Sequence, residues 1–408
     1  MRICLYTESP DLGPGGSEQF LAIIAEALSE THDVIIAHHK PEAAEKMWAE
    51  YTGCDLSRVQ FRGVALAADE SARARTPWTR FRLARAWRRE LSEGCDCFVA
   101  FLHNKPPFCY AAKGAMVILF PTYEPRKHFD DGRNFPANKP KKKKKERRRK
   151  EGIDLFASAL IHRWYGEWEW RRRLASYDVK FAISSFSRDW TRTRWGIETG
   201  LLYPPVMRPA NSTTAKENRI LSVGRFATSG HTKKQMEMLQ AFAELRVELP
   251  GWRYSSLGGL AEFPADRAYF EETRARADGE AIEVSANVEH ACLRQYFARA
   301  KIFWHAAGFG DDLGARPEMA EHFGLSTVEA MAHGCVPVVV RLGGQREIVE
   351  HGVSGFLWDS FAEMKNYTRQ LAGDPVLLER MAAAARARAQ FFSREVCVHN
   401  LLQALDLR

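Results

Sequence analysis

The sequence has no long hydrophobic run, and this absence argues against a transmembrane helix. No apolar stretch approaches the roughly 20 residues that a helix needs to cross a bilayer. The first ten residues, MRICLYTESP, also lack the long apolar stretch and small-residue cleavage site of a secretory signal. We therefore expect a cytoplasmic protein, with at most a peripheral place on the inner face of a membrane.

The sequence also lacks cysteine pairs and acidic clusters that would indicate a metal site. Its eight cysteines are scattered, and Cys95 and Cys97 do not have the two-residue spacing of zinc ribbons and redox pairs. We expect reduced, mostly buried thiols. The acidic pairs at 130–131 and 311–312 have no third ligand at a useful spacing, so we interpret both as loop acids. No metal and no cofactor is expected.

Excess positive charge is absent except in one segment. The formal net charge is +8, but residues 139–150, KPKKKKKERRRK, hold ten basic side chains and one glutamate, which gives +9 there and −1 elsewhere. This run lies in an insertion of about 131–176 and is followed by aromatic residues at 164–170. Residues 139–173 could therefore meet an anionic membrane surface. A nucleic-acid arm, which we consider unlikely, and a solvated loop are the alternatives.

Short apolar runs alternate with longer helical stretches along the whole chain. The expected strands are apolar on both faces, as parallel strands between two helical layers require. They are residues 2–6, 33–38, 96–101, 115–120, 179–184, 219–224, 253–258, 301–306 and 336–341. Segments 17–30 and 233–249 carry apolar residues at helical spacing. The pattern predicts an α/β protein with two doubly wound, Rossmann-like domains.

The length also indicates two domains, because 408 residues exceed the roughly 250–300 at which single cores stop growing. Prolines and small polar residues at 203–218 predict a linker, with a cleft between the domains. We assign residues 1–203 to an N-terminal domain and 204–375 to a C-terminal domain. The Ala- and Arg-rich end, 376–408, is expected to be helical from about 376 to 406 and could cross back onto the N-terminal domain.

Two glutamates eight positions apart form the most informative pattern. Glu321 and Glu329 flank a Gly-Leu-Ser step at 324–326, where a helix is expected to begin with Ser326 or Thr327 as its cap. The start of such a helix suits a diphosphate. Glu329 would then accept hydrogen bonds from ribose hydroxyls, and Glu321 would face a sugar. The alternative is two solvent carboxylates beside an ordinary turn.

A second pattern combines a glycine, an arginine and two lysines. Gly224 and Arg225 come directly after the strand residues RILSV at 219–223, and Lys233 and Lys234 follow at the start of a helix. Basic side chains at such a position can neutralise the charge that grows on a departing diphosphate. A solvated basic turn is the alternative.

A third pattern is the glycine-rich turn between the first strand and the first helix. It contains Gly13, Gly15 and Gly16. Such a turn can admit a phosphate or a sugar close to the backbone at a helix N-terminus. A tight structural turn has the same composition and is the alternative.

These motifs together resemble the retaining nucleotide-sugar glycosyltransferases of family 4, which have the GT-B fold. They occur in the family's order across nearly the whole chain: the glycine-rich loop, the G-R and K motif, and the E-x7-E motif. Lys233 is preferred over Lys234 because it stands nine residues before Phe242. The resemblance implies Glu321, Arg225 and Lys233 as catalytic residues. It implies as nucleotide-sugar ligands Gly15, Gly16, Arg225, Lys233, Glu321, Gly324, Leu325, Ser326 and Glu329.

The form EHFGLSTVE resembles most the branch of mannosyltransferases that build lipid-linked oligosaccharides, which slightly favours GDP-mannose as donor. The resemblance implies a donor site in the C-terminal domain and a glycan, lipid-linked or other acceptor at the N-terminal domain. Many members have a histidine after the strand equivalent to 115–120, where this chain has Pro121 and Thr122, so His103 is the candidate substitute. A nucleic-acid-binding protein and a GT-B phosphorylase or epimerase are the rival functions.

Overall fold

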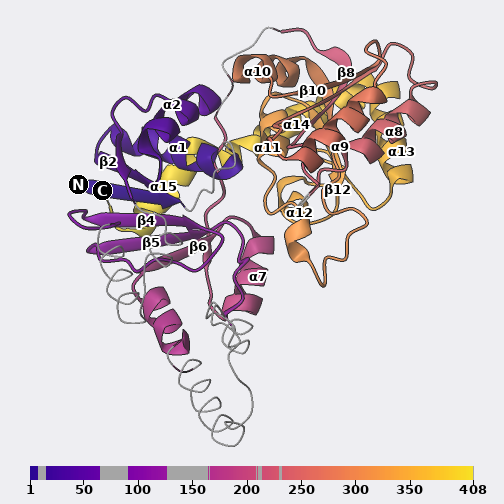
Figure 1. Ribbon diagram of the computed structural model, residues 1–408. Coiled ribbons are helices and arrows are strands. Elements are labelled where there is room, and N and C mark those ends of the chain that lie inside the picture. The colour runs from indigo at the N-terminus through magenta and orange to yellow at the C-terminus, as the bar shows by residue number, and fades with distance from the viewer. Residues whose placement is uncertain are drawn as a thin grey trace, which may run out of the picture.

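A computed structural model describes residues 1–7, 15–64, 91–125, 164, 166–207, 209, 214–228 and 232–407. Gly13, the acidic pair at 130–131 and the basic run at 139–150 lie outside these ranges. Within them the chain forms two parallel sheets, one from each half of the sequence (Figure 1). This arrangement confirms the α/β prediction of two doubly wound sheets.

The N-terminal sheet has the strand order β3-β2-β1-β4-β5-β6-β7, and all its pairings are parallel. Its strands are β1 Arg2–Thr7, β2 Asp33–His38, β3 Gln60–Gly63, β4 Cys97–Leu102, β5 Lys113–Ile118, β6 Val179–Ala182 and β7 Gly200–Leu201. The helices named in this half are α1 Gly16–Ser29, α2 Pro41–Thr52 and α7 Ser185–Trp195. The central strands β1, β4 and β5 are almost wholly buried because helices cover both of their faces.

The C-terminal sheet has the strand order β10-β9-β8-β11-β12-β13, again with parallel pairings. Its strands are β8 Glu217–Val223, β9 Arg253–Gly258, β10 Ile282–Ala286, β11 Ala300–His305, β12 Val336–Val340 and β13 Phe356–Trp358. Its helices are α8 Gln235–Leu245, α9 Pro264–Ala275, α10 His290–Arg299, α11 Leu325–Ala332, α12 Gln345–Ile348 and α13 Phe361–Gly373. The order reverses between β8 and β11, and such a switch point is where doubly wound sheets bind ligands.

The end of the chain returns to the N-terminal half, as Figure 1 shows in yellow. The expected single helix from 376 to 406 is instead α14 Pro375–Ala389, a 3-10 turn and α15 Arg394–Ala404. The prediction was wrong because Ser393 accepts a hydrogen bond from the Val396 N–H and so starts a new helix. The α15 helix packs against α1, where the Arg394 guanidinium contacts the Glu26 carboxylate at 2.5 Å.

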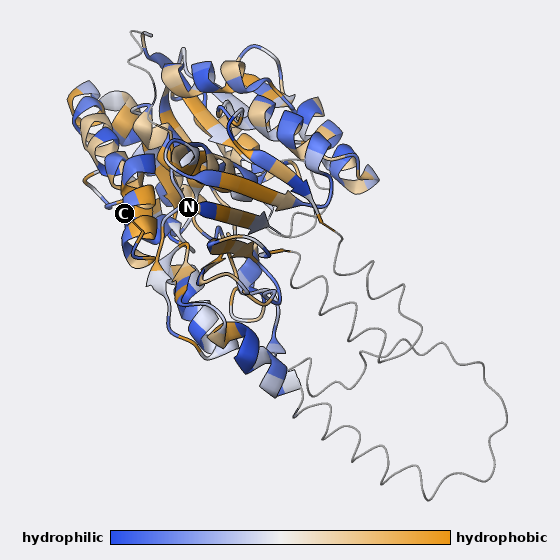
Figure 2. Cartoon of the chain, turned by 90° about the vertical axis from the view of Figure 1, so that its left-hand side faces the viewer, coloured by the Kyte–Doolittle hydropathy of each residue, from blue (hydrophilic) through white to orange (hydrophobic). Residues whose placement is uncertain are grey.

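Hydropathy follows these layers closely. Figure 2 shows that the strands of each sheet are mainly hydrophobic and that hydrophilic residues lie on the outer faces of the helices. Seven of the eight free cysteines are buried and Cys292 is exposed, which agrees with the expected buried thiols. None of the helices in the described ranges is long and apolar enough to span a membrane.

Candidate active site

The candidate site lies where the two halves meet at the carboxyl ends of their strands. Gln19 on α1 donates a hydrogen bond from Nε2 to Oε1 of Glu329 on α11, at 2.6 Å. Gly16, the first residue of α1, faces Leu325, the first residue of α11, and a Cβ on Gly16 would lie only 2.8 Å from Leu325 Cδ1. The glycine-rich loop and the helix of the E-x7-E motif are therefore neighbours where the two halves touch.

Elsewhere along the contact between the two halves, the start of α7 bonds to the C-terminal half. Ser184 donates from Oγ to the His322 carbonyl at 2.5 Å, and the Ser185 N–H donates to Glu347 Oε1 at 2.8 Å. Tyr203 in the linker donates from its hydroxyl to Glu347 Oε2 at 2.9 Å. These contacts fix the loop that carries Glu321 relative to the N-terminal sheet.

Two consecutive glycines support the backbone of Glu321. The Gly344 N–H donates to the Glu321 carbonyl at 2.8 Å. Gly343 has φ +57, and a Cβ there would lie 2.1 Å from the same carbonyl oxygen. Only glycine fits this close approach, so the 343–344 step determines where the loop lies.

The α11 helix begins at Leu325 with Gly324 as its N-cap, at φ +123 and without a side-chain cap. The prediction that Ser326 or Thr327 caps this helix is wrong, because they are its second and third residues. The positive φ explains the need for glycine at 324. Glu329 lies on the second turn of α11.

Lys233 and Glu321, which are 88 positions apart in sequence, form an ion pair. The distance from Lys233 Nζ to Glu321 Oε2 is 2.5 Å, and both side chains are mostly buried. Gly224 makes room for the lysine, because a Cβ at Gly224 would lie 2.6 Å from Lys233 Cγ. The glycine of the G-R and K motif thus allows the lysine side chain to pack against it, in addition to the role of the charged residues.

Lys234 and Arg225 have different surroundings from Lys233. Lys234 pairs with Asp311, with 3.1 Å between Nζ and Oδ2, and has φ +58. This left-handed conformation explains why α8 begins at Gln235 and not at 233 as expected. Arg225 lies two residues after the end of β8, and it is exposed. Lys234 therefore forms an ion pair with Asp311, whereas Lys233 forms one with Glu321 of the E-x7-E motif.

Glu321 has a second partner that sequence reasoning did not single out. His305, at the end of β11, has Nε2 2.9 Å from Glu321 Oε2, and its side chain is only 2% exposed. Burial lowers the pKa of His305, and its hydrogen bond to the Glu321 carboxylate opposes that shift. A histidine at the carboxyl end of a buried strand is the signal that could have found it.

Glu329 has a very different environment. Burial raises its pKa to about 7, and the hydrogen bond from Gln19 acts in the opposite direction. Tyr51 on α2 lies nearby, since Glu329, Glu18 and Arg225 all act electrostatically on its hydroxyl. Gln19 and Tyr51 were also not singled out from the sequence.

The glycine loop has its own internal bond. The Gly15 N–H donates to Glu18 Oε2 at 2.8 Å, which closes a capping box at the start of α1. Gly15 therefore already has a partner for its N–H in this structure. Gly16 instead provides the close packing with Leu325 described above.

His103, the candidate acceptor-side histidine, lies in the same cleft. Its ring centroid is 6.2 Å from that of His322, the residue after Glu321. Burial lowers the pKa of His103, while Glu18 and a hydrogen bond from the imidazole to the Phe120 backbone oppose this. Thr122 stands where the family has its histidine, and its N–H and hydroxyl both donate to the His103 carbonyl, at 2.9 and 2.7 Å.

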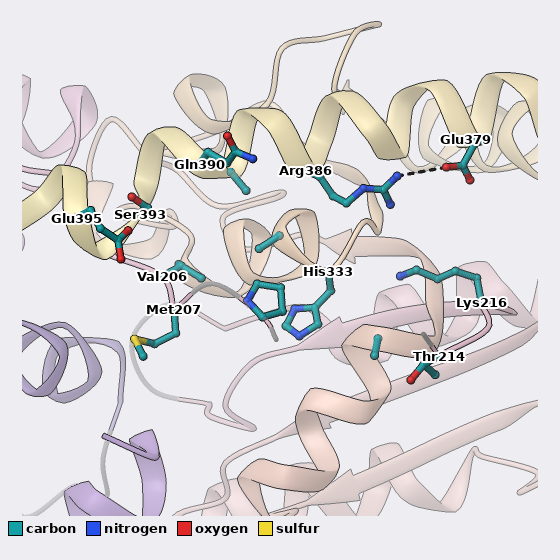
Figure 3. A pocket seen from close by; sticks show the side chains of 14 residues that line it. Val206, Met207, Thr214, Lys216, His333, Glu379, Arg386, Gln390, Ser393 and Glu395 are labelled. Carbon is teal, nitrogen blue, oxygen red and sulfur yellow. Dashed lines mark hydrogen bonds and ion pairs between the residues drawn. The ribbon is translucent and has the colours of Figure 1, made fainter. Parts of the chain in front are cut away.

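A cavity of about 740 Å³ lies away from these residues, between the linker and α14 (Figure 3). Its charged groups have partners in the protein: Lys216 donates to the Ala300 carbonyl at 2.7 Å, and Arg386 pairs with Glu379 at 3.2 Å. None of the predicted site residues lines it. Among the described residues, no cluster of three His, Cys, Asp or Glu side chains is placed to hold a metal ion.

Comparison with known proteins identifies the C-terminal half. The profile of the family "Glycosyl transferases group 1" matches residues 206–388. A GDP-Man:Man(3)GlcNAc(2)-PP-Dol alpha-1,2-mannosyltransferase of Dictyostelium discoideum is 25% identical over 225 residues, which are 50% of this chain and 42% of that protein. A D-inositol 3-phosphate glycosyltransferase of Streptomyces griseus is 44% identical over 79 residues, 19% of this chain and 16% of that protein. The chain thus spans less than half the length of these curated relatives.

Solved structures match the whole chain in fold. Anabaena Alr3699/HepE in complex with UDP has a TM-score of 0.66 at 16% sequence identity, with 100% of both chains covered. A glycosyltransferase from Rickettsia africae has a TM-score of 0.64 at 14% identity, covering 99% of this chain and 97% of that one. Residues 206–388 are therefore a glycosyl transferases group 1 domain, carried in a chain of GT-B fold.

Proposed function

We propose that the chain is a retaining glycosyltransferase that moves a hexosyl group from a nucleotide diphosphate sugar to a glycan, lipid-linked or other acceptor. The strongest support is the 2.5 Å contact between Lys233 Nζ and Glu321 Oε2, because the fold brings two motif residues together in the cleft. GDP-mannose is slightly favoured as donor, on the EHFG form of the motif and on the name of the Dictyostelium relative. UDP bound to the Anabaena structure supports a nucleotide donor more generally.

In this proposal residues 204–375 hold the donor and residues 1–203 hold the acceptor. The ribose hydroxyls donate to the Glu329 carboxylate. Arg225 and Lys233 neutralise the diphosphate, whose negative charge grows as the glycosidic bond breaks. Glu321 faces the sugar, and Gly324, Leu325 and Ser326 begin the helix whose N-terminus attracts the phosphates.

The transfer conserves the anomeric configuration of the sugar. The bond from the anomeric carbon to the diphosphate oxygen breaks, and the acceptor oxygen bonds to that carbon on the same face. The acceptor proton passes to the departing diphosphate, so the proposal includes no dedicated side-chain base. Arg225 and Lys233 do the work that a metal cation does in other glycosyltransferases.

The test is a donor screen followed by product analysis. Thermal unfolding is measured with GDP, UDP and ADP sugars, since a bound ligand raises stability by RT ln(1 + [L]/Kd). The donor that stabilises the protein is then incubated with candidate acceptors, and the anomeric configuration of the product is determined by NMR. Retention supports the proposal. Inversion contradicts it, as does a sugar phosphate formed with free phosphate or an isomerised donor formed without an acceptor.

We further propose that residues 139–173 dock the protein on an anionic membrane and so bring a lipid-linked acceptor to the cleft. In the described part of this segment, Trp164 and Trp168 are 68% and 43% exposed. The Arg172 guanidinium carbon lies 5.3 Å from the Trp168 ring centroid. Exposed tryptophans next to cations suit a membrane interface, where each basic residue contributes roughly 1 kcal/mol.

Co-sedimentation with anionic liposomes tests this docking. Replacing Lys141 to Lys145 by glutamine should abolish sedimentation at low salt and leave donor binding intact. The control replaces Arg267 and Arg274 of α9 and its C-cap residue Arg276 by glutamine and should sediment like the wild type. Equal sedimentation of the Lys141–Lys145 variant and the wild type, or sedimentation of neither, contradicts docking. Salt-dependent binding of RNA in place of liposomes would favour the nucleic-acid alternative.

A further inference from the structure

We propose that His305 is the positioning residue that holds Glu321 in place when Lys233 turns from this carboxylate to the diphosphate of the donor. This inference rests on the proposed function and assigns a role to a residue outside the E-x7-E and G-R-K motifs. It starts from one observation: His305 Nε2 and Lys233 Nζ contact the same oxygen of Glu321, at 2.9 and 2.5 Å.

The contacts of the imidazole indicate which nitrogen carries its proton. The Ala307 N–H donates to His305 Nδ1 at 3.4 Å, so Nδ1 acts as an acceptor and carries no proton. Nε2 then carries the proton and donates to the carboxylate. Burial also lowers the pKa of His305, which favours this neutral form. His305 therefore gives Glu321 a hydrogen bond without adding positive charge to the site.

Lys233 cannot remain the main partner of Glu321 once a donor is bound. Its ammonium is the motif cation expected to meet the diphosphate, and Coulomb attraction draws it toward the group with more negative charge. Its stem lies against Gly224, so the ammonium turns about a fixed base. Of the contacts that Lys233 and His305 make with Glu321 Oε2, the hydrogen bond from His305 is the one that stays after this turn.

His305 is well placed to act as a fixed anchor. It is the last residue of a central strand, and its side chain is only 2% exposed. The loop that carries Glu321 is held from its other side by the hydrogen bond of Gly344 at 2.8 Å. Loss of the imidazole should therefore leave the backbone of Glu321 in place and remove one hydrogen bond that orients its carboxylate. The effect should fall on turnover, where sugar geometry matters, more than on donor binding.

The test compares two variants of the full chain with the donor identified by the screen above. His305→Phe keeps the ring volume and removes the N–H that donates to Glu321. It should lower kcat by about tenfold to a hundredfold, the range for a lost hydrogen bond to a charged group. Its donor Kd, from calorimetry, should stay within about threefold of the wild type. His305→Gln has an amide N–H at the Nε2 position and should recover most of the turnover.

His38→Phe is the matched control, because His38 is also buried at the end of a parallel strand but belongs to the other sheet. It should leave kcat unchanged. If His305→Phe does not fold, His305→Asn replaces it, since its shorter amide reaches only the Nδ1 position. Wild-type kcat in a folded variant that lacks the N–H donated to Glu321 would overturn the inference. Equal losses of kcat in that variant and in His305→Gln would also overturn it. A wild-type protein that binds and transfers no nucleotide sugar would instead overturn the proposed function.

Discussion

The carboxylates of Glu321 and Glu329, at the two ends of segment 321–329, have different kinds of partner. Glu321, in the loop, contacts a cation and a histidine, Lys233 and His305, which both belong to the C-terminal half. Glu329, on α11, contacts the neutral amide of Gln19 from the N-terminal half, and burial raises its pKa to about 7. Under the proposed function, Glu321 would keep a partner when the donor binds, whereas Glu329 would have to exchange Gln19 for the ribose.

Loss of either basic group should have the largest effect. Arg225→Ala and Lys233→Ala should each lower kcat by on the order of 100-fold, the scale for one donor lost from a preorganised site. The reason is that charge on the departing diphosphate is greatest in the transition state. Steady-state kinetics with and without magnesium checks this, and added magnesium should restore neither variant. A strict magnesium requirement in the wild type would count against the proposed mechanism.

The two glutamates should then separate in kinetics. Glu321→Ala should lower kcat, because this side chain faces the reacting sugar. Glu329→Ala should raise donor Kd by about tenfold to a hundredfold, because the ribose is held in ground and transition states alike. Calorimetry for Kd and initial rates for kcat measure the two effects. Transfer at the wild-type rate in both variants would remove these residues from the site.

The same comparison predicts a dependence of stability on pH. The pKa of Glu329 is about 7 in the folded state and 4.5 ordinarily, so between these values the folded state holds a proton that the unfolded state has released. This contribution is present below pH 4.5 and is lost as pH rises through 7; it amounts to at most about 3 kcal/mol. Denaturation at pH 5 and pH 8 should show a smaller decrease for Glu329→Gln than for wild type. Equal decreases would refute the assignment.

Gln19→Ala should have the smallest effect and the opposite sign. The amide of Gln19 occupies Glu329 Oε1 at 2.6 Å, so ribose hydroxyls have to compete with it. Its removal should tighten donor binding about twofold to tenfold, the net value of one ordinary hydrogen bond. Calorimetric Kd measures this. Weaker binding in Gln19→Ala would mean that Gln19 contacts the donor directly.

The central strands could be predicted from sequence, and the edge strands could not. The matching strands, such as β2, β4 and β12, are apolar runs between two helical layers. The four strands absent from the prediction are β3, β7, β10 and β13, and they are the four edges of the two sheets. Edge strands are paired on one side only. Here they are also short or partly exposed, as in the two residues of β7 and the polar sequence QFRG of β3.

The site could be predicted only in part for a related reason. Motif spacing brought Glu321, Glu329 and Lys233 to attention, and the fold then brought Lys233 to Glu321. His305 is one polar residue in the apolar run KIFWHA, so the pattern identified a strand and not a site. Gln19 lies in a helix with mainly apolar neighbours, and its contact with Glu329 joins residues 310 positions apart. Such a contact follows from the arrangement of the two halves, which local sequence does not specify.

The most direct test of the account is calorimetric titration of GDP and UDP into three proteins. These are the wild type, Glu329→Ala and Arg386→Gln, the last a control at the cavity by the linker (Figure 3). The account predicts one site per chain in the wild type and in Arg386→Gln, and binding weakened at least tenfold in Glu329→Ala. Equal binding by all three proteins, or a loss confined to Arg386→Gln, would contradict the assignment of the donor site to the E-x7-E helix.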